Sequence, residues 1–203
     1  MPRNSSKIGE LVAVDGASLT LEAGAVSAIV GENGAGKSTL LKLCAGVLSP
    51  SSGRVLIGDA DLAPATMAEA SRRGVGLVHQ HFMLVGAFRA IENVVLGAEP
   101  VRSGGRLDLA TATARVREMM TASGLPVPLD AITDDLTVGE RQRLEILRVL
   151  YRGARVLLLD EPTAVLSPLE AEELYGTLRR LAAEGRAVAV VTHRLDEVVR
   201  FAD

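Results

Sequence analysis

The sequence Gly31-Glu-Asn-Gly-Ala-Gly-Lys-Ser-Thr39 decides the fold of this 203-residue chain. Its spacing of glycines, a lysine and a hydroxyl is typical of a loop that wraps phosphate, because glycines let successive backbone N–H groups point at one anion. In such a loop Lys37 bridges the β- and γ-phosphates, and the Ser38 hydroxyl binds Mg²⁺. The alternative is a glycine-rich turn without a ligand. We predict that nine residues bind a nucleoside triphosphate: Gly31, Glu32, Asn33, Gly34, Ala35, Gly36, Lys37, Ser38 and Thr39.

The flanks of this loop favour the order strand, loop, helix. Residues 25–30 form a short apolar run that suits a buried strand. Downstream of the loop, five residues fit one apolar helix face: Leu40, Leu41, Leu43, Cys44 and Val47. The positive end of a helix that begins at the loop stabilises a bound anion. The sequence therefore predicts an α/β fold of the P-loop NTPase (RecA-like) type, with a mostly parallel sheet.

Composition and charge exclude several classes of function. No apolar stretch approaches the length that spans a bilayer, so any membrane role is expected to be peripheral. The polar N-terminus shows no signal peptide, which predicts a cytosolic location. A net charge of −3 gives no overall attraction for nucleic acid, and no nucleic-acid partner is expected. We interpret the single cysteine, Cys44, as a buried small hydrophobic residue and not as a reactive thiol.

Other segments predict further strands and a helical insertion. Between residues 82 and 135 the pattern changes from strands to helices, which predicts a helical lobe inserted into the core. We therefore expect one domain over residues 1–203, with a core of residues 1–81 and 136–203 and a lobe of residues 82–135. The expected strands are residues 19–24, 53–58 and 74–79, and the expected helices of the lobe are residues 91–96 and 111–123.

Two more apolar strands end in polar side chains. Residues 155–160 end in an acid at the sheet edge where parallel α/β folds bind ligands. We expect Asp160 to hold Mg²⁺ through its water shell, and Glu161 to orient and deprotonate the attacking water. His193 ends residues 187–193 in the same way and is expected to contact the γ-phosphate. The alternatives are an ordinary acid pair at a strand end and a structural histidine.

Taken in order, these motifs resemble an ATP-binding cassette (ABC) ATPase over roughly residues 10–203. The resemblance rests on the phosphate loop, Gln80 after a strand, residues 136–143 before a helix, residues 160–163, and His193. It implies that ATP is the nucleotide, and that Gln80 links Mg²⁺ and the water to a helical lobe that docks on a membrane partner. It also implies that a signature of four residues completes the ATP site of a second cassette: Thr137, Val138, Gly139 and Glu140.

Four segments are similar in sequence to the first cassette of bacterial simple-sugar and nucleoside importers: residues 79–85, 138–140, 150–154 and 161–166. This resemblance implies an ATP-hydrolysing subunit at the cytoplasmic face of the membrane. Its partners would be transmembrane permease subunits, a second cassette that is either different or a second copy, and indirectly a solute-binding protein. One alternative is a truncated nucleotide-binding remnant with little turnover. A soluble cassette of DNA repair or translation is another, although long coiled-coil arms are absent.

Several positions depart from the family pattern. The signature Leu-Ser-Gly-Gly-Gln is replaced by Leu-Thr-Val-Gly-Glu at residues 136–140, and Ser167 stands where most cassettes have aspartate. Ile8 stands about where an aromatic residue stacks on adenine, so we expect triphosphate contacts to dominate affinity. Both ends are expected to be shortened, with polar residues 3–6 in place of the first strand and an end at residue 203 before later strands.

Overall fold

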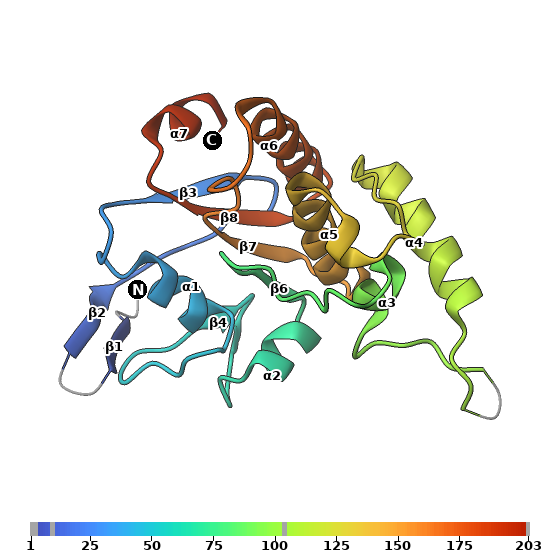
Figure 1. Ribbon diagram of the computed structural model, residues 1–203. Coiled ribbons are helices and arrows are strands. Elements are labelled where there is room, and N and C mark those ends of the chain that lie inside the picture. Colours follow the sequence, from blue (N-terminus) through green and yellow to red (C-terminus); the bar gives the residue numbers. More distant parts are fainter. Residues whose placement is uncertain (1–3, 9–10, 103–104, 202–203) are drawn as a thin grey trace.

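The computed structural model describes residues 4–8, 11–102 and 105–201. Its centre is a four-stranded parallel sheet in the order β3-β8-β7-β6, as Figure 1 shows. The strands are β3 (Val26–Val30), β6 (Val75–Val78), β7 (Val156–Asp160) and β8 (Ala187–Thr192). All four were predicted from apolar runs of nearly the same bounds. The α/β fold with a parallel sheet is thereby confirmed.

Strands β7 and β8 are covered on both faces, which explains why their sequences are apolar without alternation. Leu157 and Leu159 belong to the larger core, which lies under α5 (Val138–Tyr151) and α6 (Pro168–Ala183). Leu158, between them, belongs to a second core on the opposite face. Figure 1 shows α1 (Lys37–Cys44) and α2 (Met67–Arg72) on that second side and α6 on the first. The sheet is therefore sandwiched between helices, and β7 and β8 end in the polar residues Asp160 and Thr192 at its carboxyl edge.

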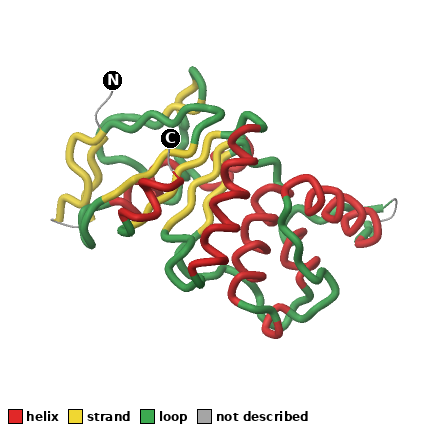
Figure 2. Tube along the Cα trace, turned by 90° about the horizontal axis from the view of Figure 1, so that it is seen from above, coloured by secondary structure: helices red, strands yellow, loops and turns green. Residues whose placement is uncertain are grey.

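The regular secondary structure that is described between residues 82 and 135 is helical. It consists of α3 (Ala90–Val95), α4 (Leu109–Ser123) and a 3₁₀ turn (Thr133–Asp135), and the two helices pack on α5. In Figure 2 a group of helices lies toward one end of the molecule, and the strands lie toward the other end together with further helices. The predicted helices of this segment are confirmed. Its boundaries as a separate lobe stay a prediction, because Ala90 and Val116 share one apolar core with the sheet.

Buried Asn93 fastens the chain that follows β6. Its Oδ1 accepts from the Val85 backbone N–H at 2.8 Å, and its Nδ2 donates to the Val85 carbonyl at 2.9 Å. Nδ2 also donates to Thr133 Oγ1 at 2.9 Å. A side chain without solvent exposure thereby satisfies the Val85 N–H and adds a second donor to the Val85 carbonyl, which also accepts from the Phe88 N–H at 3.1 Å. This fixes the path of the residues that come directly after Gln80.

Two antiparallel pairs lie outside the main sheet: β1 (Asn4–Ile8) with β2 (Leu11–Ala17), and β4 (Leu56–Ile57) with β5 (Ala60–Asp61). They confirm the expected small antiparallel part, but their positions correct other expectations. Residues 4–6 are strand, so the expectation that polar residues replace a strand there is wrong. Arg3 lies outside the described part, and so does the side chain of Ile8, the residue expected about where an aromatic residue stacks on adenine. Of residues 53–58 only two are strand.

The strand expected at residues 19–24 is absent. The chain there is irregular and turns at Ala23 and Gly24, and the preceding strand β2 has already ended at residue 17. The reason is that no neighbouring strand among the described residues runs along this segment, and an apolar alternation without a partner cannot form a ladder. Helix α1 also ends earlier than expected, at Cys44, so Val47 is exposed and does not belong to its buried face.

Within the described ranges, no helix combines the length and the apolar composition that crossing a bilayer requires.

Candidate nucleotide-binding site

The phosphate loop connects the end of β3 with the start of α1. Lys37 is the first residue of α1, and its side chain folds back over the loop. Its Nζ donates to the carbonyl of Gly31 at 2.7 Å and to that of Glu32 at 2.9 Å. The lysine is 8% exposed, so its charge is held in place at the mouth of the loop. Because an ammonium group has three donors, it can keep a cradle closed and still offer a hydrogen bond to phosphate.

Two glycines of the loop adopt left-handed backbone angles, with φ of 86° at Gly34 and 87° at Gly36. A Cβ atom on Gly34 would meet nothing within 4 Å, so the space in front of this part of the loop is open. A Cβ atom on Gly36 would lie 2.3 Å from the carbonyl oxygen of Ala13 in β2. The two positions thus need glycine for different reasons. Gly34 leaves room for an anion, and Gly36 lets the start of α1 approach the β1-β2 pair.

We expect Gly36→Ala to destabilise the fold by about 1–3 kcal/mol, since the new methyl group clashes and the backbone is strained. Urea unfolding measures this free energy. Gly176→Ala is the matched control, because Gly176 lies inside α6 and a methyl group added there would meet no atom within 4 Å. That control is expected to be neutral or to stabilise by about 0.5–1 kcal/mol. Equal effects of the two substitutions would contradict the close approach at Gly36.

Oxygen ligands for a cation come together where β7 ends beside the loop. Ser38 Oγ donates to Asp160 Oδ1 at 2.8 Å, across 122 residues of sequence. Asp160 is 6% exposed and ends β7, directly opposite Val191 of β8 in the sheet register. A hydroxyl and a carboxylate beside a phosphate-binding loop are the donors that Mg²⁺ prefers, with water completing its octahedron. The residues present therefore fit a magnesium ion.

Glu161 lies between the two other predicted catalytic side chains. Gln80 Nε2 donates to its Oε2 at 3.3 Å, and His193 Nδ1 lies 3.4 Å from its Oε1. Glu161 also has φ of 46°, and among the described residues it is the only non-glycine with a positive φ. A strained backbone of this kind marks a position that the surrounding structure holds in place. The structure thus brings Gln80, Glu161 and His193 together at the carboxyl edge of three adjacent strands.

A buried network that sequence reasoning missed supports this edge. Glu197 in α7 (Leu195–Phe201) is 5% exposed and accepts from Thr163 Oγ1 at 2.9 Å and from Tyr175 OH at 2.8 Å. Thr192 Oγ1 donates to it as well, at 3.3 Å, and Arg194 at 2.8 Å. These bonds join the chain on either side of His193 to the turn after β7. No spacing in the sequence indicated Glu197, because two of its four partners, Thr163 and Tyr175, come from segments that are far away in the chain.

The four signature residues lie apart from the loop. Thr137 is the N-cap of α5, and Val138, Gly139 and Glu140 form its first turn. In the described part of the chain, none of their hydrogen bonds reaches residues 31–39. The Glu140 carboxylate instead accepts from the Thr137 backbone N–H at 2.8 Å and from its hydroxyl at 2.9 Å. This is a capping box, and the pattern Thr-x-x-Glu indicates it in the sequence.

Ser167 also has a local function in the structure. It caps α6, with its hydroxyl donating to Glu170 at 2.7 Å in a second capping box. The Glu170 side chain in turn lies against Gly139, where a Cβ would be 2.5 Å from its Oε1. The absence of a side chain at Gly139 therefore lets α5 and α6 begin side by side. The serine that departs from the family pattern is consistent with this packing of helix ends.

Comparison with known proteins agrees with this geometry. The sequence model of one family, described as "ABC transporter", matches residues 14–164. The nucleoside import ATP-binding protein NupA of Lactococcus lactis subsp. cremoris is 45% identical over 98% of this chain and 39% of its own length. The ribose import ATP-binding protein RbsA 3 of Rubrobacter xylanophilus is 42% identical over 98% of this chain and 40% of its own length.

Solved structures match over nearly the full chain. A nucleotide-free ATP-binding cassette from an ABC transporter gives a TM-score of 0.85 at 25% identity, covering 100% of this chain and 86% of that one. A dimeric cassette in a post-hydrolysis state, bound to ADP and Pi, gives 0.80 at 28% identity, covering 99% of this chain and 89% of that one. The chain spans about two fifths of the length of the curated import proteins above.

Proposed function

The chain belongs to the ABC transporter family, and from that premise we propose that it binds and hydrolyses ATP to drive import of simple sugars or nucleosides. The observation that carries the proposal is that two groups of side chains lie at one sheet edge. Lys37, Ser38 and Asp160 form the first group, and Glu161 with Gln80 and His193 forms the second. Relatives whose printed names include nucleoside, ribose and guanosine import support the class of solute. The protein would work at the cytoplasmic face of the membrane.

In this proposal each polar side chain has a separate role. The backbone N–H groups of residues 31–39 and Lys37 bind the triphosphate of ATP. Ser38, Asp160 and Gln80 hold Mg²⁺, which supplies positive charge against the β- and γ-phosphates when bound. Glu161 orients the attacking water and accepts its proton, and His193 donates to the γ-phosphate. The contacts of Gln80 and His193 with Glu161 keep its carboxylate aimed across the loop.

A second cassette is proposed to complete the site. The signature lies at the start of α5, where the positive end of the helix dipole favours an anion. Since its hydrogen bonds stay within α5 and its cap, we propose that it serves ATP bound by another cassette. Glu140 already accepts from both donors of Thr137, so an arriving phosphate has to displace a carboxylate. This occupied signature favours a second candidate function, a nucleotide-binding unit with little turnover.

A groove beside Gln80 is a suitable place for the permease. It lies between α2, β6 and α5 and has a volume of about 630 Å³. Met67, Leu77, His79 and Arg152 are among the residues that line it. Burial lowers the pKa of His79, and nearby Arg148 lowers it further, which favours the neutral form of the histidine. A permease segment seated there would contact the residue next to Gln80.

We expect the isolated chain to bind Mg-ATP and to hydrolyse it slowly, because the signature of the same chain does not reach its own phosphate loop. The ATPase rate per molecule should rise with protein concentration, and rise further when a partner cassette is added. Steady-state ATPase measured over a dilution series tests this. Strong hydrolysis whose rate per molecule stays constant down to dilutions where the chain is monomeric would exclude a site completed by a second cassette.

Adding permease subunits separates the two candidate functions. A transport ATPase should be stimulated by its permease, whereas a regulatory unit should bind ATP with unchanged, low turnover. ATP binding measured in the same samples shows that both preparations are folded. The assay thus distinguishes a chain that lacks its partner from a chain that lacks the activity.

A further inference from the structure

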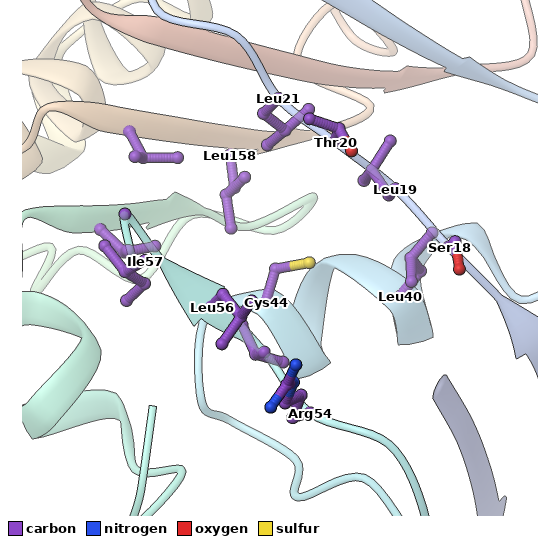
Figure 3. Close-up of a pocket in the computed structure, with 14 residues that line it drawn as sticks. Ser18, Leu19, Thr20, Leu21, Leu40, Cys44, Arg54, Leu56, Ile57 and Leu158 are labelled. Carbon is purple, nitrogen blue, oxygen red and sulfur yellow. The ribbon is translucent and has the colours of Figure 1, made fainter. Parts of the chain in front are cut away.

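A buried ion pair lies in the middle of α5. Glu145 Oε2 is 2.7 Å from Arg148 Nη2, and the two side chains are 1% and 12% exposed. This buried charge contrasts with the cavity beside β4, where Figure 3 shows Cys44 among mostly apolar side chains. Burial raises the pKa of Glu145 and lowers that of Arg148, so it works against the charge of both groups. Because the desolvation cost of such a pair can exceed the gain from pairing, stability alone does not account for it.

Both partners also bind the backbone of Met83. The Met83 N–H donates to Glu145 Oε1, and Arg148 Nη1 donates to the Met83 carbonyl, each at 2.5 Å. Within residues 80–84 these two are the only backbone hydrogen bonds that the structure describes. The Met83 side chain is 57% exposed, so its packing contributes little to holding the segment. The chain directly after Gln80 is therefore fastened to α5 through this pair.

Gln80 is close enough to depend on this attachment. Three residues of chain span at most about 11 Å, so a displacement of Met83 is passed on to Gln80. The bond from Gln80 Nε2 to Glu161 Oε2 is 3.3 Å long, at the far end of the usual range of about 2.7–3.2 Å. A further shift of a few tenths of an ångström would break this contact.

We propose that Glu145 and Arg148 are positioning residues for Gln80. They hold the backbone of Met83 and thereby set the reach of the Gln80 side chain toward Mg²⁺. The inference rests on the proposed function, in which Gln80 is one of the residues that hold this ion. Helix α5 begins at the signature, and Arg148 lines the groove proposed for the permease. One helix would thus connect both partner surfaces with the Mg²⁺ site.

The first measurement tests the attachment itself, by amide hydrogen exchange of the whole chain followed by NMR. Relative to intrinsic rates, the Met83 amide should exchange about tenfold or more slowly than the amides of His81 and Phe82, which have no described partner. The double variant Glu145→Leu/Arg148→Met replaces the pair with apolar side chains of similar size, so the fold should be kept. It should lose the protection of Met83.

The second measurement tests the effect on Gln80, as the Kd of a fluorescent ATP analogue in EDTA and over a Mg²⁺ titration. In the double variant the Kd in EDTA should be unchanged, whereas the Mg²⁺ concentration at half-effect should rise about tenfold, as when a metal ligand loses its outer support. Gln80→Ala should cause a similar rise. Adding Gln80→Ala to the double variant should cause no more, because both changes act through one side chain. Effects of a merely structural pair would add.

Two control variants separate positioning from a loss of charge. Arg148→Lys keeps the charge and a donor for the Met83 carbonyl, so the Mg²⁺ titration should stay within about threefold of that of the unsubstituted chain. Glu69→Leu/Arg72→Met is the matched control, because it removes an ion pair of the same i,i+3 spacing from α2 beside the same groove. It should change neither measurement, and thermal unfolding checks that all variants are folded.

Three outcomes would overturn the proposal. One is an unprotected Met83 amide in the unsubstituted chain. Another is an additive effect of Gln80→Ala on the double variant. The third is loss of Met83 protection with an unchanged Mg²⁺ titration, because the pair would then hold the segment without positioning Gln80. Failure of the proposed function gives a different result, since the unsubstituted chain would bind no ATP in either condition, and the role of Gln80 would fall with it.

Discussion

Replacing Lys37 by alanine is expected to abolish measurable ATP binding. The ammonium group is the only cation of the loop at residues 31–39, and the substitution also removes its bonds to the carbonyls of Gly31 and Glu32. A hydrogen bond to a charged group is worth about 1.5–3 kcal/mol, and the proposed contacts of Lys37 with both the β- and the γ-phosphate would be lost. We therefore expect Kd to rise about 100-fold or more. Titration with a fluorescent ATP analogue measures this change.

Lys42 provides the matched control for this prediction. It lies in the same helix, is half-buried, and its side chain makes no hydrogen bond or ion pair to other described residues. Lys42→Ala removes the same charge from α1 but not from the loop, and ATP affinity should stay within about twofold of the original. Thermal unfolding of both variants checks the fold. Unchanged affinity after Lys37→Ala would remove the basis for assigning the loop to ATP.

The main sheet and the polar residues at its carboxyl edge were predictable because one physical rule covers them. Strands buried on both faces are apolar throughout, and the first polar residue after each one must lie at the carboxyl edge. Asp160, Glu161, Gln80 and His193 all follow such strands, and the structure places them within contact of one another or of Ser38. The local sequence was therefore enough to predict which polar side chains lie together at this edge.

The antiparallel parts were not predictable in this way. Residues 4–7 are polar and still belong to β1, because β2 pairs with them. Residues 19–22 alternate as a strand should, yet they make no backbone hydrogen bond to another described residue. Whether such short segments become strands depends on the neighbour and not on the pattern. Glu197 shows the same limit at the site, since two of the side chains that donate to it, Thr163 and Tyr175, are distant in sequence.

Glu161→Gln is expected to keep ATP binding and to lower turnover by about 10²- to 10⁴-fold, the usual contribution of a positioned general base. Glutamine has almost the same shape as glutamate and retains an oxygen that can accept from Gln80, but it cannot take a proton from water. Single-turnover hydrolysis in a complex with a second cassette measures this effect. A titration with the same ATP analogue should give an unchanged Kd.

Glu118→Gln is the control, because Glu118 lies exposed on α4 and makes no ion pair with other described residues. If that variant and Glu161→Gln hydrolyse ATP at the same rate, the water must be positioned by another residue, and His193 is the next to test because it lies 3.4 Å from Glu161. If Glu161→Gln binds ATP without turnover and Lys37→Ala does not bind ATP, the two variants together separate the role of Glu161 in hydrolysis from the role of Lys37 in binding. Binding is then attributable to the loop, and hydrolysis to the strand end beside it.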